Sequence, residues 1–79
     1  MDRFEIEIVK DSNKLNFEVV DYAHHTDDNR CKFEIMRSGL FVASFEPDSK
    51  GFLHICKNYG IVDEETLHLI ADKLELMNL

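Results

Sequence analysis

Strict alternation of apolar and charged side chains near the start of the chain is the feature that most constrains its fold. In the segment RFEIEIV, Phe4, Ile6 and Ile8 alternate with two glutamates. Successive side chains of a β-strand point to opposite faces, so this alternation is typical of a strand with one buried and one solvated face. We therefore predict that the chain begins with such a strand.

The next segment, KDSN at residues 10–13, has the composition of a turn and predicts a hairpin. A four-residue loop would return a second strand alongside the first. The predicted pairs are Ile8 with Leu15, Ile6 with Phe17 and Phe4 with Val19. These six apolar side chains would then share one face of the sheet, where they can form a common core.

The turn RSG decides the register of a second predicted hairpin. A two-residue turn would pair Arg37 with Leu40. It would also place Phe41 and Phe45 on the same face as charged residues. A three-residue turn with Gly39 in the left-handed conformation, as in a G1 bulge, buries both phenylalanines instead, so we predict this turn. The predicted pairs are Met36 with Leu40, Ile35 with Phe41, Phe33 with Ala43 and Cys31 with Phe45.

The fifth predicted strand follows the turn PDSKG, and its inward face depends on the length of the loop. A four-residue loop would turn Phe52, His54 and Cys56 inward. A three-residue or five-residue loop would turn Leu53 and Ile55 inward. We predict the second arrangement because burial of two aliphatic side chains costs less than burial of a histidine.

The C-terminal segment has the start signal and the periodicity of a helix. Asp63 is suited to the N-cap and two glutamates follow it in the first turn. Val62 and Leu67 have the spacing of a hydrophobic staple. One apolar stripe at helical spacing is formed by Leu67, Ile70, Ala71, Leu74 and Met77. Leu69 and Leu76 fall on roughly the opposite side of this helix.

Together these elements predict one domain over residues 1–79 with an α+β fold. It is a two-layer antiparallel meander of about five strands with a single C-terminal helix packed on one face. The predicted strands cover residues 3–9, 14–22, 31–36, 40–46 and 52–57, and the helix covers residues 63–77. One helix cannot cover five strands, so we expect apolar side chains on the uncovered face, namely Val20, Tyr22, Met36, Leu40, Val42 and Phe52.

The charge of the chain limits the classes of partner. Its 79 residues carry a formal net charge of -7, whereas binding to a phosphate backbone depends on lysine and arginine. We therefore expect no nucleic acid and no membrane among its partners. An acidic surface favours encounter with a basic one.

Further features of the sequence predict a soluble, cytoplasmic protein. The first residues lack the basic start and continuous apolar run of a secretory signal. No apolar segment approaches the roughly 20 residues that cross a bilayer. The only cysteines, Cys31 and Cys56, are too few for a disulfide scaffold. Because the cytoplasm is reducing, we expect both to be free thiols.

The segment DYAHHTDDNRC, residues 21–31, contains the candidate metal ligands His24, His25, Asp27 and Cys31. A zinc or nickel site needs several such groups to converge on one point. Adjacent histidines point in different directions, and no CxxC or HxxxH pair is present. We therefore predict a polar loop between two strands and no cofactor, with a metal site as the alternative.

No combination of residues predicts catalysis. His54 and Cys56 share one face of a strand, but a cysteine nucleophile also needs a base at hydrogen-bond distance and an oxyanion hole. The segment KNYG, residues 57–60, lacks the full glycine-rich pattern of a phosphate loop. We therefore predict that the chain is not an enzyme.

Apolar residues that the predicted core leaves uncovered are the remaining functional signal. The predicted interaction surface comprises Tyr22, Met36, Leu40, Val42, Leu69 and Leu76. We therefore predict a small acidic domain that binds another protein, as an adaptor, an inhibitor or an immunity-type protein, or that forms a homodimer. The alternative is a domain that binds a small ligand or a metal through the histidine loop.

Overall fold

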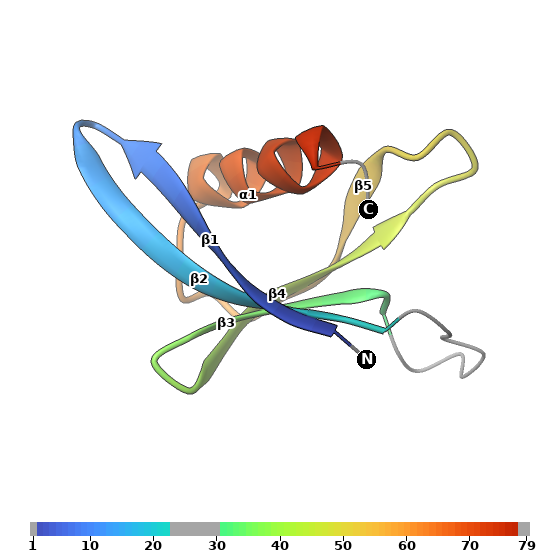
Figure 1. The fold of residues 1–79 in the computed structure, drawn as a ribbon, viewed down its shortest axis with the longest axis horizontal. Helices are drawn as coiled ribbons and strands as arrows, with labels where there is room; N and C mark the ends of the chain where they lie inside the picture. The colour runs from blue at the N-terminus through green and yellow to red at the C-terminus, as the bar shows by residue number, and fades with distance from the viewer. Residues whose placement is uncertain (1, 23–30, 78–79) are drawn as a thin grey trace.

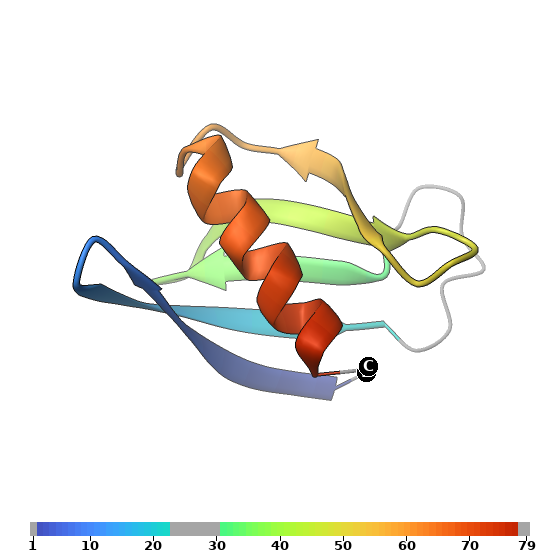
Figure 2. The same cartoon turned by 90° about the horizontal axis from the view of Figure 1, so that it is seen from above.

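The structure is a computed structural model that describes residues 2–22 and 31–77. Its elements are β1 (Asp2–Lys10), β2 (Asn13–Asp21), β3 (Phe33–Arg37), β4 (Leu40–Pro47), β5 (Leu53–Asn58) and α1 (Glu64–Leu76). The strands form one antiparallel sheet in the order β1-β2-β3-β4-β5. The helix α1 lies across one face of this sheet (Figure 1, Figure 2). The predicted α+β meander with a single C-terminal helix is confirmed.

The register of the first hairpin is as predicted. Ile8 pairs with Leu15, Ile6 with Phe17 and Phe4 with Val19. The turn itself is shorter, because Lys10 pairs with Asn13 and leaves only two residues, Asp11 and Ser12, at positive φ of 51° and 67°. Positive φ at both positions is typical of two-residue hairpin turns. A two-residue and a four-residue loop centred on the same point give the same strand partners, so the shorter turn leaves the register unchanged.

The predicted turn between β3 and β4 is wrong. Arg37 pairs with Leu40, and Ser38 and Gly39 form a two-residue turn at φ of 52° and 80°. The register then shifts inside the hairpin: Met36 pairs with Phe41, whereas Ile35 pairs with Ala43 and Phe33 with Phe45. Val42 is therefore an extra residue in β4, which is a β-bulge.

This bulge changes the environment of three residues. Phe45 is turned toward α1 and is buried, as predicted, but Phe41 stays on the opposite face and is 48% exposed. Val42 was expected on the uncovered face, and this too is wrong, because the bulge turns it into the core, where it is fully buried. A bulge thus reconciles a two-residue turn with burial of Phe45, which regular pairing could not do.

The outermost strand, β5, follows a five-residue loop, since Pro47 pairs with Leu53. Leu53 packs against the core, as predicted. Ile55 pairs with the buried Phe45 but remains 40% exposed, because β5 has a neighbouring strand on one side only. Phe52 lies in the loop before the strand and is exposed.

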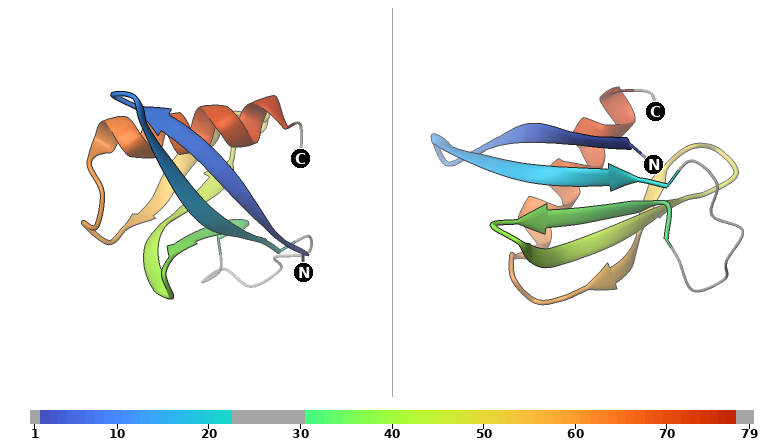
Figure 3. Two further views of the ribbon diagram at one scale, coloured as in Figure 1. Left: turned by 60° about the vertical axis from the view of Figure 1, so that its left-hand side comes forward. Right: turned by 60° about the horizontal axis from the view of Figure 1, so that its bottom comes forward.

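The helix α1 lies over one face of the sheet (Figure 3), and the side chains between these two layers form the core. The sheet contributes Ile6, Ile8, Phe17, Val19, Phe33, Ile35, Val42, Ala43 and Phe45, and the helix contributes Leu67, Ile70, Ala71 and Leu74. Asp63 is the N-cap of α1, as predicted, and its carboxylate accepts a hydrogen bond from the Thr66 amide at 2.9 Å. In the described part of the chain, no helix is long and apolar enough to cross a membrane.

Candidate interaction surface

The side of the sheet away from α1, here called the open face, is rich in acidic side chains. Alternation along each strand and the pairing between strands assign its members. Its carboxylates are Glu5, Glu7, Glu18, Glu34 and Glu46, and its lysine and arginine residues are Arg3, Lys14 and Lys57. The open face therefore carries more acidic than basic groups, in agreement with the net charge of the chain.

The ion pairs on the open face connect diagonal neighbours. Arg3 Nη1 lies 3.4 Å from Glu18 Oε1, and Lys14 Nζ lies 3.9 Å from Glu7 Oε1. Glu5 stands directly opposite Glu18, and like charges in that position repel each other. Exposed ion pairs contribute little in water, so the repulsion is only partly offset. The sheet thus retains an arrangement of charges that does not maximise its own stability.

An aromatic pair interrupts this acidic surface. The ring centroids of Phe41 and Tyr59 lie 5.8 Å apart with the planes tilted by 30°, and each side chain is 48% exposed. Tyr59 follows β5 directly and is held beside β4, because its amide donates a hydrogen bond to the Val42 carbonyl at 3.2 Å. Met36 pairs with Phe41 and shares its face. These three residues, Met36, Phe41 and Tyr59, form what we call the aromatic patch.

A shallow depression adjoins the aromatic patch on the open face. Its lining includes Glu5 and Glu18 from the first hairpin and Met36 from β3. Lys14 and Arg37 also line it, so its charge is mixed. The depression is open to solvent, and it extends the patch toward the acidic strands β1 and β2.

A second apolar region lies between α1 and the edge of β1. A shallow groove there is lined by Ile8, Val9, Leu69 and Leu76, with Glu7 and Asp72 beside them. Leu76 is 84% exposed, as expected for the outer side of the helix. Leu69 packs against the core and is only partly exposed, so it is less exposed than the sequence predicts.

The six residues of the predicted interaction surface lie in different parts of the fold. Met36 and Leu40 lie in the β3–β4 hairpin, whereas Leu69 and Leu76 lie on α1. Tyr22 is half-buried after β2, and Val42, as described above, belongs to the core. Phe41, Tyr59 and Val9 are exposed but were not predicted as surface residues. Tyr59 directly follows β5, so the pairing of β4 with β5 would place it on this surface.

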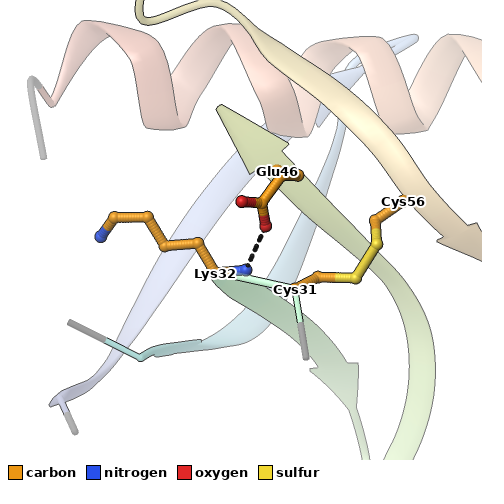
Figure 4. The surroundings of a disulfide bond; sticks show 4 residues. All are labelled: Cys31, Lys32, Glu46 and Cys56. Atoms are coloured by element: carbon orange, nitrogen blue, oxygen red, sulfur yellow. Dashed lines mark hydrogen bonds between the residues drawn. A yellow bond between two sulfur atoms is a disulfide. The ribbon is translucent and has the colours of Figure 1, made fainter. Parts of the chain in front are cut away.

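The prediction of two free thiols is wrong. Cys31 and Cys56 form a disulfide bond with a Cα–Cα distance of 6.4 Å (Figure 4). Cys31 stands just before β3, and Cys56 is an extra residue in β5, since Phe45 pairs with Ile55 and Ser44 with Lys57. This second bulge lets the two side chains meet across β4. Regular pairing of these strands would not predict contact between the two cysteine side chains.

The disulfide also affects the candidate metal site. Cys31 has no thiolate to offer a metal while it is bonded to Cys56. The other candidate ligands, His24, His25 and Asp27, lie outside the described residues. Within residues 2–22 and 31–77, no group of three or more histidine, cysteine or carboxylate side chains is placed to hold a metal ion.

His54 and Cys56 do not form a nucleophile and base pair in this structure. The sulfur of Cys56 is bonded to Cys31. His54 Nε2 instead lies 2.9 Å from Asp48 Oδ2, and this hydrogen bond is the main cause of a lowered pKa at Asp48. Asp48 also accepts hydrogen bonds from the amides of Lys50 and Phe52, so it organises the loop before β5.

Polar contacts of Lys10 with residues at the start of α1 join this helix to β1, in addition to the packing of both elements in the core. Lys10, at the end of β1, donates a hydrogen bond to the carboxylate of Asp63, the N-cap of α1.

No protein-family model, curated protein or solved structure matches this chain.

Proposed function

We propose that this chain is a non-catalytic protein-interaction domain that binds a basic surface of another protein through its open face. The observation that carries the proposal is the aromatic patch, Met36, Phe41 and Tyr59, set among the carboxylates of the open face. Exposed apolar side chains that gather on a small domain usually mark a contact surface. Aromatic residues and methionine are also enriched in the centres of protein interfaces.

The two parts of this surface would have different roles. The aromatic rings would supply affinity, because complete burial of a large apolar side chain contributes about 1.5–3 kcal/mol. The surrounding carboxylates would attract a basic partner and repel an acidic one, so they would raise the association rate and the specificity. An inhibitor or an immunity-type protein that covers a basic site fits this combination, and so does an adaptor.

A homodimer through the open face is less favourable on charge. Each copy carries a net charge of -7, and an open face rich in carboxylates would meet the same face of a second copy. Such like-charge contacts oppose association. Light scattering at low and at physiological salt tests this point, and a stable dimer at low salt would contradict the preference for a basic partner.

Quantitative affinity capture with matched variants tests the proposed surface. The baits would be the unchanged chain, a Phe41→Ser/Tyr59→Ser variant and, as control, a Phe52→Ser variant at another exposed aromatic residue, each shown by circular dichroism to be folded. We expect a small set of basic proteins bound by the unchanged chain and the control but lost from the double variant. Identical sets from all three baits would contradict a role for the open face.

The location of the protein is a separate proposal. The expected cytoplasmic location predicted free thiols, whereas Cys31 and Cys56 form a disulfide, a bond that persists mainly in oxidising compartments. We therefore propose that the chain acts where the bond between Cys31 and Cys56 stays oxidised. Alkylation of acid-quenched native material should then leave both cysteines unlabelled, whereas two added labels would favour the cytoplasm.

A further inference from the structure

The free edge of β1 carries unpaired backbone groups over a long stretch. The Tyr22 amide donates to the Lys32 carbonyl at 2.8 Å, so even-numbered residues of β2 bond toward β3. Odd-numbered residues of β2 then bond toward β1, where their partners are even-numbered. The amides and carbonyls of Glu5, Glu7 and Val9 therefore point away from the sheet, and β1 is paired on one side only.

This edge lacks most devices that protect edge strands. Such strands are commonly short, kinked by a bulge or interrupted by proline. β1 instead has nine residues, contains no proline and pairs with β2 without a register shift. The other edge strand, β5, has six residues, and its Leu53 amide donates to the Glu75 carboxylate at 3.0 Å. The β1 edge is therefore the more accessible template for a further strand.

The charges on β1 determine which strand can pair there. Glu5 and Glu7 lie on the open face, so a second copy of β1 would place carboxylates close to carboxylates. Cross-strand pairs of like charge are destabilising, whereas pairs of opposite charge are stabilising. An incoming strand with lysine or arginine on this face is therefore favoured over a second copy of the chain.

The groove beside the β1 edge supplies the complementary apolar surface. Val9, Leu69 and Leu76 line this groove, and the side chains of Val9 and Leu76 are exposed to an incoming strand. Glu7 and Asp72 add negative charge to the lining, and Lys73 is the one cation among the lining residues. The strand β1 and the helix α1 are packed together in the core, so the two sides of the groove are already in place before a segment binds.

From these observations we propose that the β1 edge is a second binding site, for an extended peptide segment of a partner in which basic and apolar residues alternate. The segment adds a sixth strand beside β1. Its backbone bonds to the outward amides and carbonyls of Glu5, Glu7 and Val9, which is the strand-addition mode of peptide recognition. Its basic side chains lie beside Glu5 and Glu7, and its apolar side chains enter the groove at Leu69 and Leu76. This site is separate from the aromatic patch.

A titration followed by two-dimensional amide NMR tests the proposal with a defined probe. The probe is a blocked nine-residue peptide in which lysine alternates with valine, and the first control carries glutamate in place of lysine. A second control carries N-methyl groups on alternate amides, which removes the backbone donors of one edge. We expect the probe to shift amide signals of residues 3–9 and 69–76 and to slow amide exchange at Glu5 and Glu7. Both controls should bind at least tenfold more weakly.

Variants of the chain separate this site from the aromatic patch. Glu5→Lys/Glu7→Lys should reverse the preference, so that the glutamate peptide binds at least tenfold more tightly than the lysine peptide. Phe41→Ser/Tyr59→Ser should leave binding of the lysine peptide unchanged. Equal binding of the N-methylated peptide, shifts centred on Phe41, or no shifts at millimolar peptide would each overturn the proposal. None of these outcomes would decide whether the aromatic patch binds a partner.

Discussion

Asp63 connects two elements of this small fold, β1 and α1. Its carboxylate caps α1 through the Thr66 amide and accepts a hydrogen bond from Lys10. Hydrogen bonds from Lys10 and then from Thr66 hold the pKa of Asp63 well below its usual range. The same bond is the main reason that the pKa of Lys10 is raised. One side chain thus links the end of β1 to the start of the helix.

Acid should therefore weaken the fold through Asp63. A carboxylate whose folded pKa lies below its unfolded value of about 3.9 stabilises the fold above that pH, and this contribution is lost as the pH falls toward the folded pKa. Urea denaturation should show that the free energy of unfolding falls more between pH 7 and pH 3 in the unchanged chain than in Asp63→Asn. Asp2→Asn, at an exposed position, serves as control. Equal losses in all three proteins would contradict this role of Asp63.

Two leucines on α1 make a matched pair for testing the core. Leu74 is buried and Leu76 is 84% exposed. Leu74→Ala should lower the free energy of unfolding by about 2–5 kcal/mol, because it leaves a cavity, and Phe33→Ala should have an effect of similar size. Leu76→Ala should change it by less than about 0.5 kcal/mol. Chemical denaturation measures all three, and similar values for the two leucine variants would refute the assigned helix orientation.

At the scale of elements, prediction from sequence succeeded where regular alternation continued and failed at bulges. The first hairpin and α1 follow simple periods, so the partners of Ile6 and the cap at Asp63 were predicted correctly. A bulge adds one residue to one strand and leaves no clear mark on apolar periodicity. The bulges at Val42 and Cys56 therefore hid the exposure of Phe41 and the disulfide bond.

The disulfide should matter most for β5, which has little buried surface of its own. Cys31 and Cys56 are separated by 25 positions in the chain, and closing a loop of this size typically stabilises a fold by about 2–4 kcal/mol. Cys56→Ser should remove that contribution, and hydrogen exchange should increase most in β5. The Cys31→Ser/Cys56→Ser variant should match the single variant. A larger loss of stability in the double variant would show that the Cys31 side chain contributes to the fold apart from the disulfide bond.

Removal of the repulsion between Glu5 and Glu18 should stabilise the fold, unlike the substitutions described above. Glu5→Lys places opposite charges across the first hairpin and should raise the thermal midpoint. Glu7→Lys is the matched control, because Glu7 faces Asn16 and would lose its ion pair with Lys14. It should lower the midpoint slightly. A fall with Glu5→Lys would show that this carboxylate has a favourable role within the sheet.

At the scale of the whole molecule, one side of the sheet holds the core and most of the other side is open to solvent and partners. Val20, expected on the uncovered face, does lie there, but it is buried, and so is Ser44. The net charge and the expectation of uncovered apolar residues came from the sequence, but the grouping of those residues did not. Val42 lies in the core and Phe41 on the open face because the side to which each residue turns depends on the register of β4. Only the folded chain brings Phe41 and Tyr59 together.

Hydrogen exchange of the chain alone and bound to its captured partner is the most direct test of the proposed function. Binding through the open face should slow exchange in residues 36–42 and 57–61, which surround the aromatic patch. The partner surface protected in the same experiment should be basic. Protection that leaves both segments of this chain unchanged would contradict the account.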